Sequence, residues 1–266
     1  MELGGKSVLL TGATGGLGQA IARVLAARGA RLVLSSRKGD ELAKLAQSLA
    51  GGDHRTIVAD LAAENAAERL VAEAGEVEVL VANAGLPAGG RLERFSQEEL
   101  TRALRVNLEA PIKMARELVP AMRERRSGHL VFISSLQGKV AFARTSVYTA
   151  TKFGLRGFAL ALRDDLWGTD VGVSVVLPGF IREAGMFAES GAGRAPAGLG
   201  TSSPDEVGEG VATAIERNRA EVAVAPLRQR LAASFAHRRP RLASRATRVS
   251  AGRVADEVAR GQADKR

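Results

Sequence analysis

The sequence predicts an α/β protein built on a doubly wound, mostly parallel sheet of seven strands with helices on both faces. Two observations support this prediction. From residue 6 onward, short apolar runs alternate with glycine turns and amphipathic stretches, which is typical of a parallel sheet covered by its crossover helices. The chain has 266 residues, of which 45% are hydrophobic, so it can bury one large core.

Seven apolar runs supply the expected strands. They lie at residues 6–11, 31–35, 55–59, 77–82, 129–134, 172–177 and 221–224. Helices are expected between them. Gly29 should lie just past the end of the first helix, because glycine adopts the left-handed conformation at little cost. Ser96 with Glu99 and Ser203 with Glu206 have the spacing of capping boxes, which start helices at those serines.

Composition excludes several kinds of chemistry. The chain contains no cysteine, which rules out disulfides, thiol catalysis and thiolate metal sites, and fits a reducing cytosol. His54, His129 and His237 lack the spacing of metal ligands, so we expect no metal site and assign them surface or strand-end roles. Phe158 and Trp167 have helical spacing and are expected to pack in the core.

The N-terminal residues run directly into the first apolar strand. They lack the separate basic and apolar regions of a secretory signal. Nowhere in the chain does an apolar stretch reach the length of a membrane span. We therefore expect a cytoplasmic protein.

Tyr148 and Lys152 are the most informative pair in the sequence. Their i, i+4 spacing on a helix places a phenol and an ammonium on one face, with Cβ atoms about 5 to 6 Å apart. Moving the pKa of a tyrosine from about 10 to near 7 takes about 4 kcal/mol. A positive charge at about 4 Å supplies energy of that order at an effective dielectric constant near 20. We therefore expect Lys152 to lower the pKa of Tyr148, which then serves as a general acid or base.

A glycine-rich turn, Thr11-Gly-Ala-Thr-Gly-Gly-Leu-Gly18, follows the first strand and opens the first helix. In that context, glycines let backbone N–H groups and a helix N-terminus approach a pyrophosphate. Such a turn also occurs without a ligand, so alone it is weak evidence. The residues expected to contact a cofactor here are Gly12, Thr14, Gly15, Gly16, Leu17 and Gly18.

Six elements occur in a fixed order along the chain: the glycine turn, Asn83-Ala84-Gly85, Asn107, Ser135, Tyr148 with Lys152, and Pro178-Gly179. On these motifs the chain resembles the short-chain dehydrogenases/reductases, over about residues 4–225. The resemblance implies a Rossmann-type fold and NAD or NADP as the cofactor. It also implies a second set of cofactor contacts: Arg37, Asp60, Leu61, Asn83, Ala84, Gly85, Tyr148, Lys152, Pro178, Gly179 and Ile181.

The resemblance further implies four catalytic residues. Ser135, chosen over its neighbour by its spacing to Tyr148, would hydrogen-bond the reacting oxygen, and Tyr148 would transfer the proton. Lys152 would hold the nicotinamide ribose, and Asn107 would anchor a water that links Lys152 to solvent. Purely structural alternatives exist for three of these residues: a half-buried tyrosine, a solvated lysine and an asparagine at a helix kink before Pro111.

The end of the second strand indicates which cofactor is used. An acidic side chain there would accept hydrogen bonds from a ribose 2′-OH, whereas a basic one would meet a 2′-phosphate. This chain has Ser35-Ser36-Arg37 and no acid, and a guanidinium fork matches phosphate. We therefore expect NADP(H) to be favoured over NAD(H). The alternative is a solvated arginine at a strand end.

Residues 182–203 are rich in Gly, Ala, Ser and Pro and show no periodicity, so we expect a mobile substrate lid there. One residue at its start departs from the family pattern. Family members often carry a threonine a few residues after Pro-Gly, but this chain has Glu183, which cannot donate a hydrogen bond while ionised. A backbone amide near Ile181 could replace the threonine.

Residues 1–226 are expected to form the cofactor-binding domain, and residues 227–266 a basic C-terminal extension. The extension carries eleven Lys or Arg and three Asp or Glu, which leaves the rest of the chain near neutral within a total charge of +9. Leu227, Leu231 and Phe235 follow helical spacing among arginines. The extension is open to three interpretations: a solvated tail, a cap on the substrate cleft, or a weak peripheral contact with an anionic membrane. Its single aromatic residue argues against nucleic acid.

The combined motifs predict an NADP(H)-dependent carbonyl reductase or alcohol dehydrogenase acting on a small apolar or lipid-like ketone or alcohol. The resemblance implies a homodimer or homotetramer. Two other functions stay open. The protein could bind NADP as a sensor or interaction protein without turnover, or serve as a scaffold at a membrane through its basic extension.

Overall fold

The computed structural model describes residues 1–184, 198–239 and 241 of the chain. The strands of its sheet are β1 (Ser7–Thr11), β2 (Arg31–Ser36), β3 (Arg55–Val58), β4 (Val79–Ala82), β5 (Gly128–Ile133), β6 (Val171–Pro178) and β7 (Glu221–Val224). They form one seven-stranded sheet in the order β3-β2-β1-β4-β5-β6-β7, and every pairing is parallel. This confirms the predicted fold class, and each strand lies within two residues of its expected bounds.

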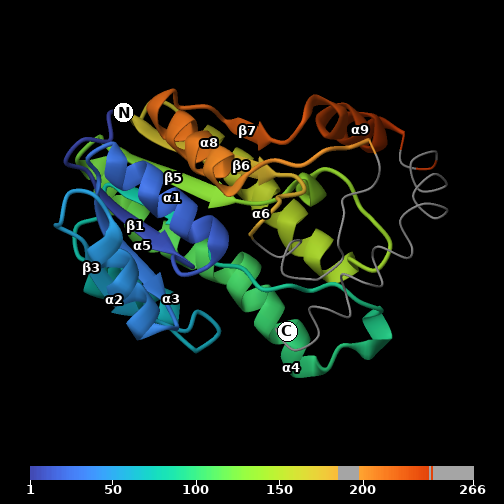
Figure 1. Cartoon of the computed structure of the whole chain (residues 1–266), viewed down its shortest axis with the longest axis horizontal. Helices are drawn as coiled ribbons and strands as arrows, with labels where there is room; N and C mark the ends of the chain where they lie inside the picture. The colour runs from blue at the N-terminus through green and yellow to red at the C-terminus, as the bar shows by residue number, and fades with distance from the viewer. Residues whose placement is uncertain (185–197, 240, 242–266) are drawn as a thin grey trace.

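Helices cover both faces of the sheet (Figure 1). The α-helices are α1 (Gly16–Ala27), α2 (Gly39–Ser48), α3 (Ala66–Ala74), α4 (Gln97–Leu104), α5 (Ala110–Glu124), α6 (Ser146–Asp165), α8 (Pro204–Glu216) and α9 (Leu227–Arg238). Short turns of other helix types are η1 (Leu92–Arg94), η2 (Arg105–Glu109) and η3 (Leu136–Gly138). No helix in the part of the chain that the structure describes is long and apolar enough to cross a bilayer.

Two hydrophobic cores lie on opposite faces of the sheet because neighbouring strand residues point to opposite sides. Leu9 of β1 belongs to the core that contains residues of α3, α5 and α6, whereas Leu10 belongs to the core with α1, α2 and α8. Both leucines are fully buried, and burying such a side chain stabilises the fold by about 1.5 to 3 kcal/mol. Because both faces of the sheet are buried, the strand sequences are continuous apolar runs and do not alternate between apolar and polar residues.

The predicted helix ends are confirmed. Ser96 accepts a hydrogen bond from the Glu99 backbone while Glu99 reaches back to Ser96, and Ser203 with Glu206 forms the same reciprocal pair. Gly29 follows the C-cap of α1 with a φ of +81°. These short-range signals therefore set the entry to α4 and α8 and the exit from α1.

Two aromatic residues were expected to pack in the core, and for one of them this expectation was wrong. Phe158 packs edge-on against Phe132, with ring centroids 5.5 Å apart. Trp167, however, is 86% exposed. Helix α6 ends at Asp165, and Leu166 takes the last buried position, so the helical period does not extend to Trp167.

The two histidines whose side chains are described have structural roles. His129, second in β5, is buried, and its Nε2 lies 2.8 Å from the Ser174 hydroxyl on β6. His54 accepts a hydrogen bond from the backbone N–H of Leu32 at Nδ1. The third, His237, has a side chain outside the described residues.

Candidate active site

The glycine turn after β1 is packed so closely that side chains would not fit at two positions. A Cβ on Gly12 would lie 2.8 Å from the Cα of Ala84, and Gly12 has a φ of +65°. A Cβ on Gly18 would lie 2.1 Å from the carbonyl oxygen of Gly12. Helix α1 starts at Gly16, and its N-cap, Gly15, supplies no side chain to bond the first helical N–H groups. Those N–H groups are therefore available to an anion.

A network of hydrogen bonds joins this turn to the loop after β4. The buried hydroxyl of Thr11 accepts the backbone N–H groups of Asn83 and Ala84, both at 3.1 Å. In return, the Asn83 side chain donates to the carbonyl oxygens of Thr11 and Gly12, at 3.0 and 3.2 Å. The structure thus brings two predicted cofactor segments together, and Gly85 follows directly in the second. Sequence reasoning did not assign a role to Thr11, although its place at the end of β1 was a usable signal.

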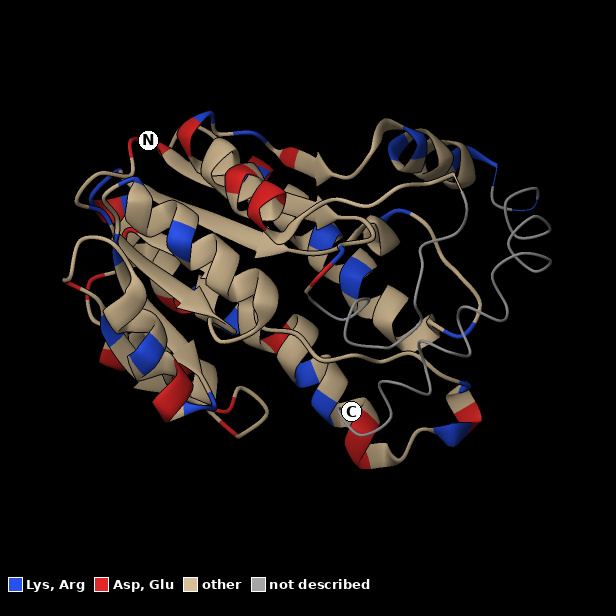
Figure 2. Cartoon of the chain, in the orientation of Figure 1, with Lys and Arg blue, Asp and Glu red and all other residues tan. Residues whose placement is uncertain are grey.

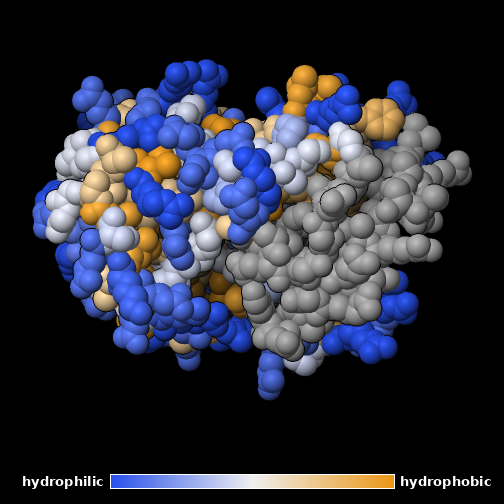
Figure 3. Space-filling model, in the orientation of Figure 1, coloured by the Kyte–Doolittle hydropathy of each residue, from blue (hydrophilic) through white to orange (hydrophobic). Residues whose placement is uncertain are grey.

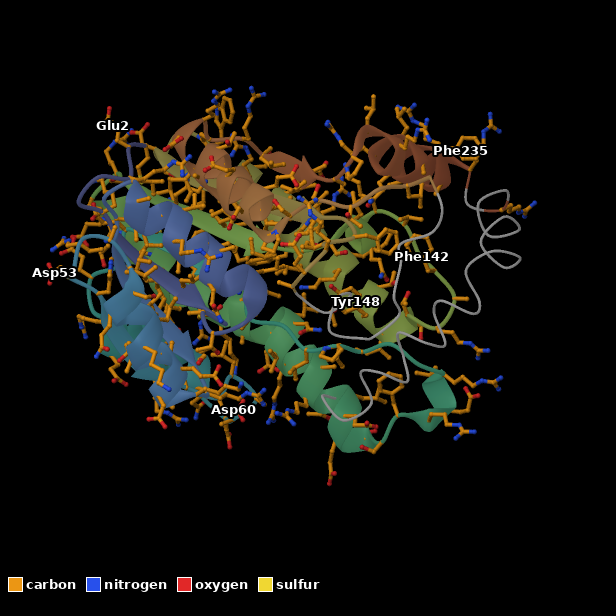
Figure 4. The ribbon with its side chains drawn as sticks, in the orientation of Figure 1. Glu2, Asp53, Asp60, Phe142, Tyr148 and Phe235 are labelled. Carbon is orange, nitrogen blue, oxygen red and sulfur yellow. The ribbon has the colours of Figure 1, made fainter. Side chains whose placement is uncertain are left out.

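Arg37 and Asp60 follow β2 and β3, which pair along their length and end at the same edge of the sheet. Both side chains are exposed. Asp60 accepts the backbone N–H of Ala62, and Figure 4 shows it at the outer edge of the molecule. The ammonium of Lys38, next to Arg37, is paired with Glu41 at 2.7 Å. Arg37 makes no ion pair with any residue in the described part of the chain, so its guanidinium faces solvent.

Ser135, Tyr148 and Lys152 come together at the end of β5. Ser135 follows that strand, and its side chain lies close enough to Tyr148 to act against the rise in the pKa of the phenol. Lys152 lies one turn after Tyr148 on α6, with its Nζ 5.6 Å from the centroid of the tyrosine ring. This Nζ donates to the carbonyl oxygen of Ile133, the last residue of β5, at 2.9 Å. The three predicted residues therefore share one edge of the sheet.

Burial dominates the titration of this pair. It raises the pKa of Tyr148 to about 12, and the Ser135 side chain acts in the opposite direction. Burial also lowers the pKa of Lys152 to about 8. The expectation that Lys152 lowers the pKa of Tyr148 was thus wrong for this structure. The physical reason is that desolvation disfavours both charged forms, and the ammonium is bonded to the Ile133 carbonyl.

Ser134 was passed over in the sequence analysis and fixes the position of α6. Its buried hydroxyl donates to the backbone carbonyl oxygen of Lys152 at 2.9 Å. Gly138 makes the close approach possible, since a Cβ there would lie 2.7 Å from the Ser134 hydroxyl oxygen. The two adjacent serines therefore have different roles. Ser134 anchors α6, and Ser135 lies next to Tyr148.

Asn107 lies in η2, a π-helical turn between α4 and α5. Its buried side chain accepts the backbone N–H of Leu86 at 2.7 Å and donates to the Leu86 carbonyl oxygen at 2.9 Å. The next residue, Leu108, packs against Gly154 of α6, where a Cβ would lie 3.2 Å from its side chain. Asn107 thus ties the loop after β4 to the helix beside α6. Its anchoring of a water next to Lys152 stays a prediction.

The loop after β6 contains the last predicted cofactor residues. Gly179, directly after Pro178, donates its backbone N–H to the Val224 carbonyl oxygen at 3.0 Å. Ile181 forms a parallel bridge with Ser202, so the two ends of the segment 182–203 lie side by side. Most of the predicted lid, residues 185–197, lies outside the described residues.

Glu183 has an exposed side chain and a φ of +68°. Its carboxylate accepts from Arg182 Nε at 3.1 Å. The contact turns the acidic group toward a solvent-exposed arginine at the start of the lid.

Gln229 of α9 is the residue that sequence reasoning missed most clearly. Only 4% of it is exposed, and its Oε1 accepts the backbone N–H of Phe180 at 3.1 Å. Its Nε2 donates to the carbonyl oxygens of Gly200, at 2.7 Å, and Leu199, at 3.4 Å. A Cβ on Gly179 would lie 2.2 Å from the same Oε1. Gln229 therefore holds both ends of the lid segment from within the C-terminal extension.

The fold and the grouped side chains are those expected of a nucleotide-dependent oxidoreductase. Residues 6–195 match the short chain dehydrogenase family. The chain is 40% identical over 228 residues to Ketoacyl reductase HetN of Nostoc sp., covering 84% of this chain and 79% of that protein. It is 32% identical to the 3-oxoacyl-[acyl-carrier-protein] reductase FabG of Escherichia coli, covering 73% and 85%.

Solved structures agree with these relatives. A metagenomic short-chain oxidoreductase in complex with NADP aligns with a TM-score of 0.69 at 33% identity, covering 85% of this chain and 99% of that one. A short-chain dehydrogenase from Streptomyces avermitilis aligns with a TM-score of 0.72 at 27% identity, covering 82% and 87%. The chain belongs to the short-chain dehydrogenase/reductase family and is an NAD(P)-dependent enzyme.

Proposed function

We propose that this protein is an NADP(H)-dependent carbonyl reductase that reduces an apolar or lipid-like ketone. In the reverse direction it would act as an alcohol dehydrogenase on the corresponding alcohol. The observation that carries the proposal is the grouping of Ser135, Tyr148 and Lys152 at the edge of the sheet that also holds the glycine turn. In open α/β sheets, ligands bind at the carboxyl ends of the strands.

The residues present fit a dinucleotide. Gly12 and Gly18 keep the turn tight, because a Cβ at either position would clash with backbone atoms, and the Thr11 and Asn83 side chains hold the two flanking loops together. The first N–H groups of α1 have no side-chain cap and can meet a pyrophosphate. When bound, a nicotinamide cofactor supplies or accepts the hydride. The residues that would hold it are Gly12, Thr14, Gly15, Gly16, Leu17, Gly18, Arg37, Asp60, Leu61, Asn83, Ala84, Gly85, Tyr148, Lys152, Pro178, Gly179 and Ile181.

Tyr148 is the proposed proton donor to the carbonyl oxygen. With a pKa of about 12, its phenol carries its proton at neutral pH, which suits the reductive direction. Ser135, whose side chain lies beside the phenol, would donate a hydrogen bond to the same oxygen. Lys152, whose pKa is about 8, is mostly protonated at neutral pH and offers further N–H donors to a ribose. Asn107 keeps the loop after β4 in place beside them.

A Tyr148→Phe variant tests the proposal against a sensor that binds NADP without turnover. The phenylalanine keeps the ring but removes the transferable proton. We expect NADPH binding, measured by fluorescence titration, to stay within about threefold, while turnover falls by a factor on the order of 10² to 10⁴. Unchanged turnover would remove Tyr148 from the mechanism. Turnover absent from the wild-type protein across a wide ketone panel would favour the sensor.

Cofactor choice rests on Arg37. Its guanidinium faces solvent at the end of β2, and the neighbouring Lys38 is already paired with Glu41. A charge-assisted hydrogen bond contributes about 1.5 to 3 kcal/mol, which corresponds to a factor of about 10 to 100. We expect Arg37→Ala to lower kcat/KM for NADPH by that factor and to leave kcat/KM for NADH unchanged, with Lys38→Ala as the matched control. A wild-type preference for NADH would refute this assignment.

The substrate class is proposed from the relatives, two of which are named as ketoacyl reductases. We propose that a 3-oxoacyl chain or a comparable apolar ketone is reduced. A panel of ketones of increasing chain length, followed by NADPH absorbance, tests this. We expect kcat/KM to rise with chain length, because each buried CH₂ contributes about 0.8 kcal/mol. Enzymes of this family are commonly oligomeric, and we propose a dimer or tetramer of this chain, measurable by light scattering.

A further inference from the structure

Helix α9 has two faces with opposite properties. Leu227, Leu231 and Phe235 are 65%, 60% and 54% exposed, and together they form an outer apolar stripe at i, i+4 and i+8. Phe235 is labelled in Figure 4, at the outer end of the helix. On the other face, Ala233 and Ala236 are buried in the core.

The helix cannot rotate to bury its outer apolar stripe. Gln229 lies on the inner face and bonds three backbone groups of the lid segment ends. A rotation would break those bonds and withdraw Ala233 and Ala236 from the core. The fold therefore presents three large apolar side chains to the surroundings and holds them there. A contiguous apolar patch fixed in this way marks an interaction surface.

The outer apolar stripe is surrounded by positive charge. The arginines of α9 and the residues just after it are all exposed: Arg228, Arg230, Arg238, Arg239 and Arg241. The sequence contains no Asp or Glu between residues 227 and 241. Figure 2 shows basic and no acidic colour on α9, and Figure 3 shows apolar and charged surface side by side there. Residues 1–226, in contrast, are close to neutral.

We propose that α9 docks this protein on the surface of an anionic lipid bilayer. Apolar side chains of such a helix enter the boundary between headgroups and acyl chains, while arginines at its sides meet lipid phosphates. A second copy of this chain fits less well, because a symmetric contact would bring two sets of five arginines together without an acidic partner. The proposal goes beyond the enzymatic function and does not depend on it.

Co-sedimentation of the full-length protein with vesicles tests the proposal. We expect binding to vesicles of phosphatidylcholine and phosphatidylglycerol at 3:1, weaker binding in 0.5 M salt, and little binding to pure phosphatidylcholine. The variant Leu227→Ser/Leu231→Ser/Phe235→Ser should bind the anionic vesicles at least ten times more weakly. Trp167→Ser is the matched control, because Trp167 is 86% exposed and lies outside α9.

A charge variant keeps the test decisive if the serine variant folds poorly. Arg230→Gln/Arg238→Gln/Arg239→Gln removes two exposed charges from α9 and one from the residue after it, and it should also weaken anionic binding at least ten times. Its control, Arg69→Gln/Arg123→Gln/Arg217→Gln, removes three exposed charges elsewhere and should bind as the wild type does.

Three results would overturn the proposal. The first is a wild-type protein that does not sediment with anionic vesicles. The second is equal binding by the α9 charge variant and its control. The third is a wild-type oligomer that fails to bind vesicles and dissociates in the serine variant, as seen by light scattering. In that case the outer apolar stripe would join two copies of the chain.

Discussion

Replacing Gln229 with methionine tests whether the C-terminal helix holds the active-site loops. Methionine has nearly the volume of glutamine, so the packing of the side chain is kept and its hydrogen bonds are lost. Two of those bonds have good geometry, from Phe180 N at 3.1 Å and to Gly200 O at 2.7 Å. The third, to Leu199 O at 3.4 Å, is weak.

The expected loss of stability follows from these two bonds. A neutral hydrogen bond contributes about 0.5 to 1.5 kcal/mol net, and a buried group left without a partner costs about 1 to 3 kcal/mol. Gln229 is only 4% exposed, but Phe180 and Leu199 are half-buried and Gly200 is exposed, so water reaches its backbone partners more easily. We therefore expect the free energy of unfolding to fall by about 2 to 4 kcal/mol. For a chain of this size, that lowers Tm by about 5 to 12 °C.

Thermal and urea unfolding followed by circular dichroism measure this change. Gln97→Met is the matched control, because Gln97 is exposed at the start of α4, and its Tm should stay within about 1 °C of the wild type. Kinetics at 20 °C, where the variant stays folded, should show KM for the ketone raised several-fold with kcat less affected. A Tm for Gln229→Met within 1 °C of the wild type would refute the reasoning.

Two further predictions concern the sheet and the glycine turn. Burial lowers the pKa of His129 to about 3 in the folded protein, whereas its ordinary value in the unfolded chain is about 6.5. As the pH falls below 6.5, the unfolded chain therefore binds a proton at His129 that the folded protein does not bind. Between pH 6.5 and pH 3, the free energy of unfolding should therefore fall by about 4 kcal/mol more in the wild type than in His129→Gln, as measured by urea titrations. Gly18→Ala should weaken NADPH binding at least tenfold in a fluorescence titration, since its Cβ would lie 2.1 Å from Gly12 O, whereas Gly157→Ala, with open space around it, should not.

The parts of the fold that sequence predicted depend on local signals. A short apolar run of β-branched and aromatic residues bounded by turn residues favours an inner strand, and β5 lies within one residue of its predicted bounds. The capping boxes at Ser96 and Ser203 are complete within four residues of chain. The pairing of Ser135 with Tyr148 was inferred from motif order, and the geometry brings the two together.

The parts that sequence did not predict depend on contacts between distant segments. Gln229 meets Phe180 across 49 residues, and Ser134 meets Lys152 across 18, so neither role leaves a local pattern. The rise in the pKa of Tyr148 has the same origin. Spacing places a lysine on the same helix face, but only the packed structure shows that desolvation dominates the pKa of Tyr148.

Helix α9 shows why truncation alone cannot assign the C-terminal extension. A chain cut after Pro226 would lack the outer apolar stripe and its arginines. In the structure the same cut also removes Gln229 from the lid ends and Ala233 and Ala236 from the core. Reduced turnover after truncation would therefore follow from the loss of the inner-face contacts of α9, and it would give no information on whether the outer apolar stripe binds a membrane. Substitutions confined to Leu227, Leu231 and Phe235 separate the two faces, because those side chains lie away from the core.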